Sequence, residues 1–376
     1  MKDNVWKRII RLKRLCFLLL IPVSMLILLI VKKSTWVAEV IFAKGVYKVV
    51  SHFIAVVTGL LPFSLAEWIL VLGPIALAAL MIIFIIRLIR TKQDVKFRII
   101  KALINVSCVL SIGFFVYTIG CGTNYHRASI GVYLGLTIEP SSEQELYGLC
   151  LDLADRANEL REQITSVDED WVYKLSMNVS ELAKEAQNAY KKIAKKMDVF
   201  SGLYPKSKPV FFSRFMSKME ITGIFIPFTM EANVNVDIPD YSIASTMCHE
   251  LAHLQGFMRE DEANYISYLV TTTSGNVELA YSGVMEALIL SGNALYDKNK
   301  ELYAQLRETY SEGVVADLRA NSMYWKQFEN TTVSTMANKV NDTYLKVNNQ
   351  DDGVQSYGRM VDLLLAEYRS KNETNK

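Results

Sequence analysis

Histidine, cysteine and excess charge are all scarce in this sequence. The 376 residues include only four histidines and five cysteines, and the formal net charge is only +2. Because basic and acidic residues nearly balance, nothing indicates the basic surface that nucleic-acid binding requires, and we expect no nucleic-acid partner. The cysteine number is odd and no pair has C-x-x-C spacing, so neither a disulfide framework nor a zinc–thiolate site is indicated, although Cys121 and Cys150 could pair if both lie outside the cell. The sequence also lacks internal repeats and low-complexity tracts.

Long apolar runs, in contrast, fill the first third of the chain. Three of them predict transmembrane helices at about residues 15–32, 67–87 and 102–122, because a helix needs roughly 20 mostly apolar residues to cross a bilayer. The first run lacks a small-residue cleavage site and is followed at once by Lys32 and Lys33. We therefore interpret it as a retained anchor and not as a signal peptide.

The segment between the first two predicted spans, residues 34–64, is apolar but interrupted by charge. Glu39, Lys44 and Lys48 would be costly on a lipid-facing span. We therefore predict an amphipathic helix that lies on the outer membrane surface, with the charged residues in a stripe along it. The alternative is a further span, which would move the rest of the chain to the cytoplasm.

Basic residues predict the orientation of this anchor. The stretch before the first span and the loop at residues 87–101 each carry six Lys or Arg residues. Short basic loops stay in the cytoplasm, so residues 1–122 are expected to form a multi-pass anchor in the cell membrane, with the lipid bilayer as partner. Residues 123–370 are then an extracytoplasmic domain, and residues 371–376 are expected to be a disordered tail.

The patterns in residues 123–370 indicate an α+β fold that is mostly helical. Ser142 lies three residues before Glu145 in a capping-box pattern ahead of helical periodicity. Three short stretches then predict strands of a small sheet, KPVFFS, ITGIFIPFT and NVNVDI. Helical patterns resume after Asp240 and continue to the end. This order of helices, a small sheet and more helices is not that of a doubly wound sheet.

The most informative short motif is CHELAH, in which His249 and His253 lie four residues apart. On a helix these two residues share one face, so both imidazoles point to one place. Two imidazoles and a carboxylate are ligands that a catalytic Zn²⁺ accepts. Glu250 lies next to the first histidine, where a general base for zinc-activated water is expected. The alternative interpretation is a histidine pair in a helical core.

The stretch REDEANYISYL (residues 259–269) can supply the third protein ligand. Gly256 can end the first helix and turn the chain back. On a second helix Glu260 and Glu262 would point about 200° apart, so only one of them faces the metal. We favour Glu260, with Asn264 one turn later as hydrogen-bonding partner of a ligating imidazole. Glu262 stays as the alternative ligand.

Further candidates for the site come from other parts of the chain. Tyr281, Tyr357 and Arg359 could donate a hydrogen bond to the oxyanion of a hydrolysis reaction. Packing is the competing interpretation for the tyrosines, because the chain contains 19 of them. IPFTMEANVNV (residues 226–236) lies just upstream of the predicted metal helix and could be an edge strand that binds a substrate peptide.

Two family resemblances rest on these motifs. HELAH followed by Glu260-x-x-Ala263-Asn264 resembles the gluzincin branch of zinc metallopeptidases, in which a second helix supplies a glutamate ligand. The gap between the two motifs is short, and Asn264 stands where Asp is more usual. More closely, the layout is similar to a bacterial membrane family known as domain of unknown function 3810. That similarity runs through LPFSLAEW, NYHR, GIFIPFTMEANVN, HELAHLQGFMREDEANYISYL and VNDTYLKVNNQDDGVQSYGRMVDLLL.

These resemblances imply a zincin-like domain behind a membrane anchor. The expected function is that of a membrane-anchored zinc metallopeptidase, with Zn²⁺ on His249, His253 and Glu260 and with Glu250 as base. It would hydrolyse peptide bonds of a peptide or protein substrate at the outer face of the membrane. The alternative is a catalytically inactive zinc-binding sensor or scaffold in the cell envelope, against which the intact Glu250 argues.

Overall fold

The computed structural model describes residues 5–348, 350 and 359–374 of the chain. Its contacts divide the chain into two compact units. The first unit contains residues up to Val50, Leu65–Arg127 and Pro227–Thr229. The second unit contains Ser51–Ser64, Ala128–Ile226 and the described residues from Met230 onward. The boundary thus follows Arg127, five residues later than the predicted one, and residues 51–64 belong to the second unit.

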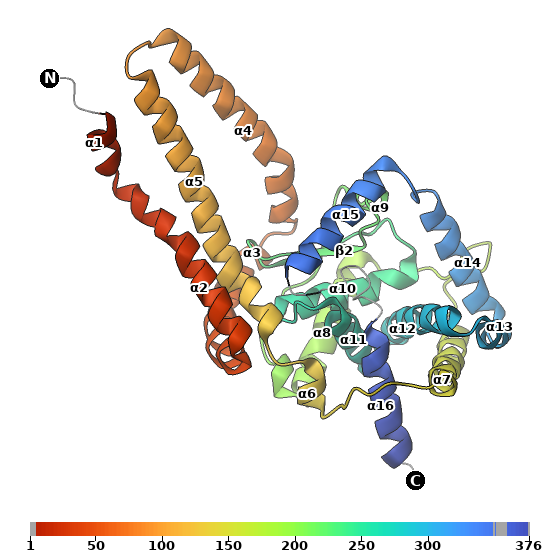
Figure 1. Cartoon of the computed structure of the whole chain (residues 1–376). Helices are drawn as coiled ribbons and strands as arrows, with labels where there is room; N and C mark the ends of the chain where they lie inside the picture. The colour runs from red at the N-terminus through yellow and green to blue at the C-terminus, as the bar shows by residue number, and fades with distance from the viewer. Residues whose placement is uncertain (1–4, 349, 351–358, 375–376) are drawn as a thin grey trace. The chain divides into compact units, whose positions relative to one another are not determined.

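The first unit is entirely helical over its described residues (Figure 1). Its elements are α1 (Val5–Ile10), η1 (Lys13–Leu19), α2 (Leu20–Lys33), η2 (Val37–Tyr47), α4 (Leu65–Arg90), α5 (Val95–Gly120) and η3 (Gly122–His126). Helix α3 (Lys48–Gly59) continues directly from η2 and passes into the second unit at Ser51.

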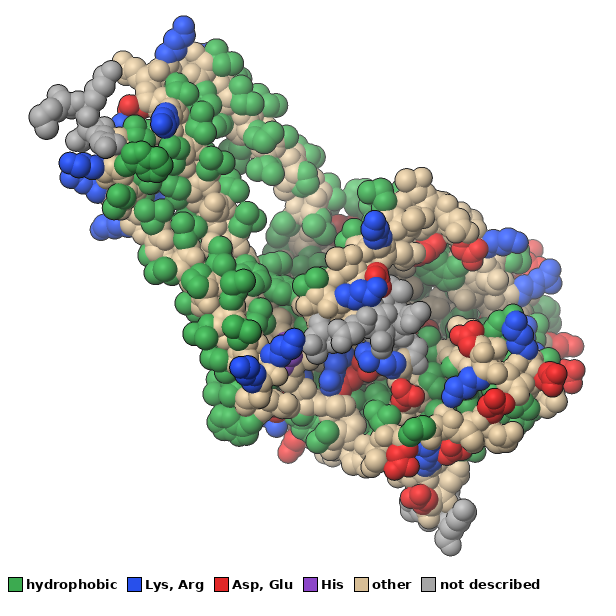
Figure 2. All heavy atoms as spheres, in the orientation of Figure 1, with side chains coloured by type: hydrophobic (Ala, Val, Ile, Leu, Met, Phe, Trp, Pro, Cys, Tyr) green, Lys and Arg blue, Asp and Glu red, His purple; other side chains and the backbone are tan. Residues whose placement is uncertain are grey.

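Helices long and apolar enough to cross a membrane fill this unit. They are Lys13–Lys33, Val37–Gly59, Leu65–Arg90 and Val95–Gly120. Three of them coincide with the predicted spans. Leu70 and Leu77 on α4 are 64% and 61% exposed, and apolar side chains cover the surface of this unit (Figure 2). Such a surface is compatible with a membrane protein, because lipid removes these side chains from water.

The remaining helix, Val37–Gly59, lies in the segment that was predicted to be amphipathic. Its first part, η2, is a π-helix, whose wide turn brings Glu39 and Lys44 close enough for an ion pair of 3.5 Å. Arg127 also binds both carboxylate oxygens of Glu39, at 3.2 and 3.1 Å. Glu39 is therefore buried in an ion pair and not part of a solvated stripe, so that prediction was wrong for this residue.

The second unit is mostly helical with one small sheet. Its helices are α6 (Ile130–Leu134), α7 (Glu143–Glu162), α8 (Val179–Ala194), η4 (Asp198–Phe200), α9 (Ser213–Lys218), α10 (Asp240–Leu254), α11 (Glu260–Thr273), α12 (Val277–Lys298), α13 (Lys300–Glu308), α14 (Glu312–Lys326), α15 (Thr332–Val347) and α16 (Met360–Thr374). Its strands are β1 (Lys208–Pro209), β2 (Gly223–Ile226) and β3 (Glu231–Val234). The predicted capping box of Ser142 and Glu145 opens α7.

The sheet has the order β1-β3-β2, with β1 parallel and β2 antiparallel to β3. The prediction that residues 226–236 form an edge strand was wrong. Pro227 follows β2 at once and the chain turns back, with Met230 at a positive φ of 49°. The strand after this turn, β3, pairs with both other strands and is the central one, so β1 and β2 lie at the two edges of the sheet.

Helices α10, α11 and α12 pack against one another in the core of this unit. Met247, Leu251 and Ala252 on α10 have no exposed surface. The metal motif therefore lies on a helix that is enclosed by protein.

At the other end of the chain, the predicted disordered tail was wrong for residues 371–374, because α16 continues to Thr374. An ion pair of 2.7 Å between Lys371 and Glu367, one turn apart, stabilises this last part of the helix.

Candidate metal centre

Gly256 ends the helix that carries both histidines, as the sequence predicts. Its φ is +85°, a left-handed conformation that glycine adopts without steric cost. The N–H of Gly256 donates to the carbonyl of His253 at 2.9 Å, and that of Phe257 donates to the carbonyl of Ala252 at 3.1 Å. This Schellman arrangement reverses the chain within a few residues. Helix α11 can therefore begin at Glu260, only six residues after α10 ends.

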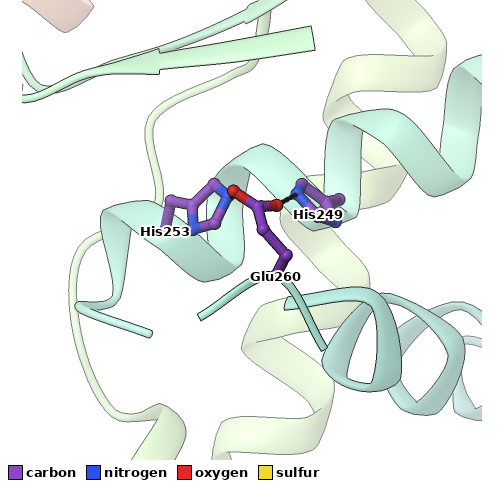
Figure 3. Close-up of side chains that lie close together, drawn as sticks. All are labelled: His249, His253 and Glu260. Carbon is purple, nitrogen blue, oxygen red and sulfur yellow. Dashed lines mark hydrogen bonds and ion pairs between the residues drawn. The ribbon is translucent and has the colours of Figure 1, made fainter. Parts of the chain in front are cut away.

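His249 and His253 on α10 and Glu260 at the start of α11 come together (Figure 3). Each offers one ligand atom, and these atoms all lie within 4.8 Å of one another. Oε2 of Glu260 lies 3.1 Å from Nε2 of His249 and 3.5 Å from Nε2 of His253. The two imidazole rings are 4.7 Å apart and nearly perpendicular. Such a group of one carboxylate and two imidazoles can hold a metal ion.

The backbone also fixes which nitrogen of His253 faces the cluster. Its Nδ1 lies 2.7 Å from the carbonyl oxygen of Phe257. A carbonyl only accepts hydrogen bonds, so Nδ1 carries a proton and Nε2 is the nitrogen that faces Glu260. The same chain reversal that starts α11 therefore orients the second histidine.

Burial and mutual charge shift the pKa values of this cluster strongly. Burial lowers the pKa of His253, but the charge of Glu260 and the hydrogen bond with it outweigh this effect and raise the pKa to about 9. Burial raises the pKa of Glu260, but His253 and His249 outweigh it and lower the pKa to about 2. Without a metal, a protonated imidazole thus supplies the positive charge that stabilises the Glu260 carboxylate. A metal cation would supply positive charge at the same place.

Glu262, the alternative third ligand, lies elsewhere. Its carboxylate binds Arg259 at 2.5 and 3.0 Å and accepts a hydrogen bond of 2.7 Å from the backbone N–H of Ile130. Glu262 is buried, and these contacts occupy both of its oxygens. The geometry therefore brings Glu260, and not Glu262, to the two histidines.

Glu250 is buried between the metal cluster and the edge strand. Burial raises its pKa to about 7, against the lowering by His249 and His253. The backbone N–H of Phe225 on β2 donates to its carboxylate. No described residue provides a hydrogen bond to its other oxygen, Oε2. A pKa near neutrality suits a group that takes up and releases a proton.

Gly223 allows β2 to pass this close to α10. A Cβ atom at this position would lie 2.7 Å from Cγ2 of Thr246 and 2.8 Å from Cγ of Glu250. Both distances are too short for a real side chain, so only glycine fits here without displacing Glu250.

The remaining predicted site residues have different positions. Asn264 is buried on α11, one turn after Glu260. The hydroxyl of Tyr281 donates to Asp317 at 2.6 Å, so its only proton is not available to an oxyanion, and that prediction was wrong. Arg359 lies close enough to Asp261 for its charge to lower the pKa of that carboxyl, which burial raises. Tyr357 lies outside the described residues.

Sequence reasoning missed two polar residues beside the cluster. Oε1 of Gln350 accepts a hydrogen bond of 3.4 Å from the N–H of Glu260, and Gln350 is buried. Glu286 on α12 lies close to His249, whose charge lowers the pKa of Glu286 against the raising effect of burial. No spacing rule links either residue to the motif, because their elements lie far from it in the sequence.

Comparison with known proteins identifies the family of this chain. The family model described as "Protein of unknown function (DUF3810)" matches residues 42–365. This is most of the chain, which therefore belongs to that family. The matched region contains both histidines, Glu250 and Glu260. No curated protein and no solved structure matches the chain.

Proposed function

We propose that this protein is a membrane-anchored zinc metallopeptidase that hydrolyses peptide bonds outside the cytoplasm. One observation carries the proposal: Glu260 lies between the imidazoles of His249 and His253, while Glu250 beside them has a raised pKa. Three nitrogen and oxygen ligands of this kind, with a nearby carboxylate, are typical of hydrolytic zinc sites.

The donor set fits zinc better than harder cations. Imidazole suits zinc, whereas Mg²⁺ and Ca²⁺ prefer sites made of oxygen atoms. His249, His253 and Glu260 would hold the ion, and Phe257 would keep Nε2 of His253 turned toward it through the hydrogen bond to Nδ1. When bound, Zn²⁺ supplies Lewis acidity toward a carbonyl group and makes water more acidic.

Glu250 would act as the general base in this site. Its pKa of about 7 lets it accept a proton from water and pass it on to the leaving amine at neutral pH. The edge strand β2 carries Phe225, whose N–H already binds this carboxylate, so a substrate beside β2 would lie next to the base. Peptide or protein chains are the substrates that an edge strand can align.

The alternative function is a zinc-binding sensor or scaffold without hydrolytic activity. Such a protein needs the three ligands but not a buried carboxylate beside them. Burying Glu250 at 4% exposure with an oxygen that no described donor reaches carries a cost in stability. That cost is easier to explain in an enzyme.

Substitution of Glu250 separates these two functions. We expect Glu250→Gln in the full-length, detergent-solubilised protein to bind zinc as the native protein does. Its cleavage of a peptide library should fall by roughly 10²–10⁴-fold, the usual contribution of a general base. Zinc content by mass spectrometry and cleavage by product sequencing are measured on the same samples. A native protein that binds zinc stoichiometrically and cleaves no peptide would instead support the scaffold.

The proposal includes three membrane spans, with Val37–Gly59 not crossing the bilayer. Arg8 pairs with Asp94 at 2.8 Å, which brings the N-terminal stretch to the loop between α4 and α5. At the start of Val37–Gly59, Glu39 pairs with Arg127, which follows α5. At its end, the carbonyl of Thr58 accepts a hydrogen bond from Lys208. Both ends are thus bound by residues that come after the last span.

A topology test distinguishes three spans from four. With basic residues at the N-terminus and in the loop before α5 kept in the cytoplasm, three spans place the C-terminus outside. We expect an alkaline phosphatase fused after Lys376 to be active and a green fluorescent protein at the same site to be dark. The reverse pattern would support four spans and a cytoplasmic metal centre.

A further inference from the structure

One helix of the second unit has its polarity reversed relative to a helix of a water-soluble domain. On α3 the small or polar side chains of Ser51, Ala55 and Thr58 are buried. Phe53, on the opposite side, is 72% exposed, and Leu60, just after the helix, is 81% exposed. A helix in water faces its apolar side toward the core. The outward side of α3 therefore needs apolar surroundings.

A buried lysine brings a second apolar segment to this helix. Nζ of Lys208 on β1 donates to the carbonyl oxygens of Thr58 and Phe63, at 2.7 and 2.9 Å, and pairs with Glu231 at 2.5 Å. Lys208 is buried, so breaking these contacts would leave a charge without compensation. The end of α3 is therefore firmly bound to the start of the segment that follows β1.

That segment exposes three phenylalanines directly after β1. Phe211, Phe212 and Phe215 are 79%, 42% and 55% exposed, and the first two rings contact each other at 5.1 Å. Together with Phe53, Leu60 and Phe63 they form a set of exposed apolar side chains that we name the apolar patch. Soluble proteins rarely expose so many large apolar side chains together.

Basic residues predominate in the sequence around these phenylalanines. Residues 199–219 contain no Asp or Glu, but they contain four Lys or Arg residues. Of these, Arg214 and Lys218 are exposed, and Arg214 pairs with Asp237 at 3.1 Å. Aromatic side chains flanked by basic ones favour the headgroup region of a bilayer that contains anionic lipid.

We propose that the apolar patch inserts into the headgroup region of the lipid bilayer. Helix α4, which is long and apolar enough to span, begins at Leu65, only two residues after Phe63. Phe63 is therefore held where the apolar helix starts, and the Lys208 contacts hold the segment before Phe211 beside it. Lipid is the apolar phase already present at this point of the chain, whereas a protein partner would have to displace it.

The patch gives the second unit its own attachment to the membrane, in addition to its covalent links to the spans. The anchoring depends neither on the metal nor on peptide hydrolysis, so its failure can be distinguished from a failure of the proposed hydrolytic function.

Photo-crosslinking in a defined bilayer tests this proposal. The full-length protein, with benzoylphenylalanine in place of Phe211 or Phe215, is reconstituted into nanodiscs that contain phosphatidylglycerol with alkyne-labelled acyl chains. The matched control has the same group in place of Trp171, which is 73% exposed in a turn that carries Asp168 and Asp170. We expect roughly fivefold or more lipid adduct at positions 211 and 215 relative to position 171.

Two results would overturn the proposal. One is lipid labelling at positions 211 and 215 no greater than at position 171. The other is adduct formed mainly with a second protein chain, which would make the patch a protein interface. A Phe53→benzoylphenylalanine variant gives an independent measurement on α3, and circular dichroism confirms that each variant is folded. Exchange of phosphatidylglycerol for phosphatidylcholine should lower the labelling if the basic residues contribute as proposed.

Discussion

Two buried polar clusters of the second unit differ in how fully their groups are paired. In the first, Oδ2 of Asp317 binds Nε of Arg161 at 2.7 Å and the hydroxyl of Tyr281 at 2.6 Å, and Oδ1 accepts from the N–H of Tyr173. In the second, Oε2 of Glu260 faces the two imidazoles of His249 and His253, and Glu250 has an oxygen that no described donor reaches. The paired groups of the first cluster account for its structural role, whereas the second cluster has the arrangement that the proposed cation would complete.

The difference implies that loss of a group should have opposite consequences in the two clusters. In the first cluster, removal of a group should lower the free energy of unfolding and leave metal binding intact. In the second cluster, it should lower metal affinity. The experiments below follow from this contrast.

The largest effect is expected for Asp317→Ala. Asp317 has no exposed surface, and its removal would leave the buried Arg161 without its carboxylate partner. We expect the free energy of unfolding to fall by roughly 3–5 kcal/mol, as for other buried ion pairs that lose one member. Chemical denaturation of the full-length protein in detergent measures this change. Zinc loss from molecules that stay folded would show that the Asp317 cluster belongs to the metal site after all.

A smaller effect, on metal affinity, is expected for Glu260→Gln, with Glu262→Gln as its matched control. The first change removes a charged ligand, so zinc affinity should fall by at least about 100-fold. The second removes a partner of Arg259 and Ile130, so it should lower stability and leave zinc affinity nearly unchanged. Competition with a fluorescent chelator measures both affinities. Retention of zinc by Glu260→Gln would disprove its role as ligand.

Protons should compete with zinc at this cluster. Below its pKa of about 9, metal-free His253 carries a proton that zinc must displace. Apparent zinc affinity should therefore rise about tenfold per pH unit toward pH 9, and about one proton should be released per ion bound at neutral pH. Titration calorimetry in buffers of different ionisation enthalpy counts these protons. An affinity that does not change between pH 7 and about 8 would contradict a protonated His253.

The same pKa shifts affect the stability of the metal-free protein. His253 has a raised pKa, so its contribution is complete below about 6.5, the value in the unfolded chain, and is lost as pH rises through about 9. Glu260 has a lowered pKa, so its contribution is complete above 4.5 and is lost as pH falls through about 2. Without metal, these two groups together stabilise the fold most at weakly acidic pH. Thermal unfolding with a chelator present, between pH 5 and about 9, follows the loss.

The smallest effect is expected for Tyr281→Phe. This change removes one hydrogen bond to Asp317 and should lower the free energy of unfolding by about 1 kcal/mol. Peptide cleavage should stay at the native level, since the hydroxyl already donates within the Asp317 cluster. A large loss of cleavage with normal zinc content would restore Tyr281 as an oxyanion donor.

Local patterns in the sequence predict the parts of this molecule that depend on neighbouring residues. The spacing of the two histidines, the break at Gly256 and the capping box at Ser142 involve only short stretches, and their geometry follows from one helix or one turn. The strand order does not follow in this way. Strand β3 is central because it pairs with both β1 and β2, and no residue propensity indicates these pairings in advance.

Long-range pairs account for what sequence could not decide. Spacing alone left Glu260 and Glu262 as alternatives, and the choice required Ile130, which lies 132 positions before Glu262. Glu39 was expected in the charged stripe of an amphipathic helix. The local sequence does not reveal its partner, Arg127, which follows 88 residues later. Glu286 reaches the cluster from α12 and Gln350 from outside any helix or strand, and neither carries a motif of its own.

Gly223 adds a criterion for comparing this chain with other members of its family. Because no Cβ fits between β2 and Glu250, an alanine here would displace Glu250, the proposed base, while every residue of the HELAH motif stays in place. A family member that keeps the motif but carries a larger residue at the position of Gly223 is therefore expected to hold this glutamate differently. The motif alone would assign the proposed activity to such a chain, whereas the replaced glycine predicts that the activity is lost.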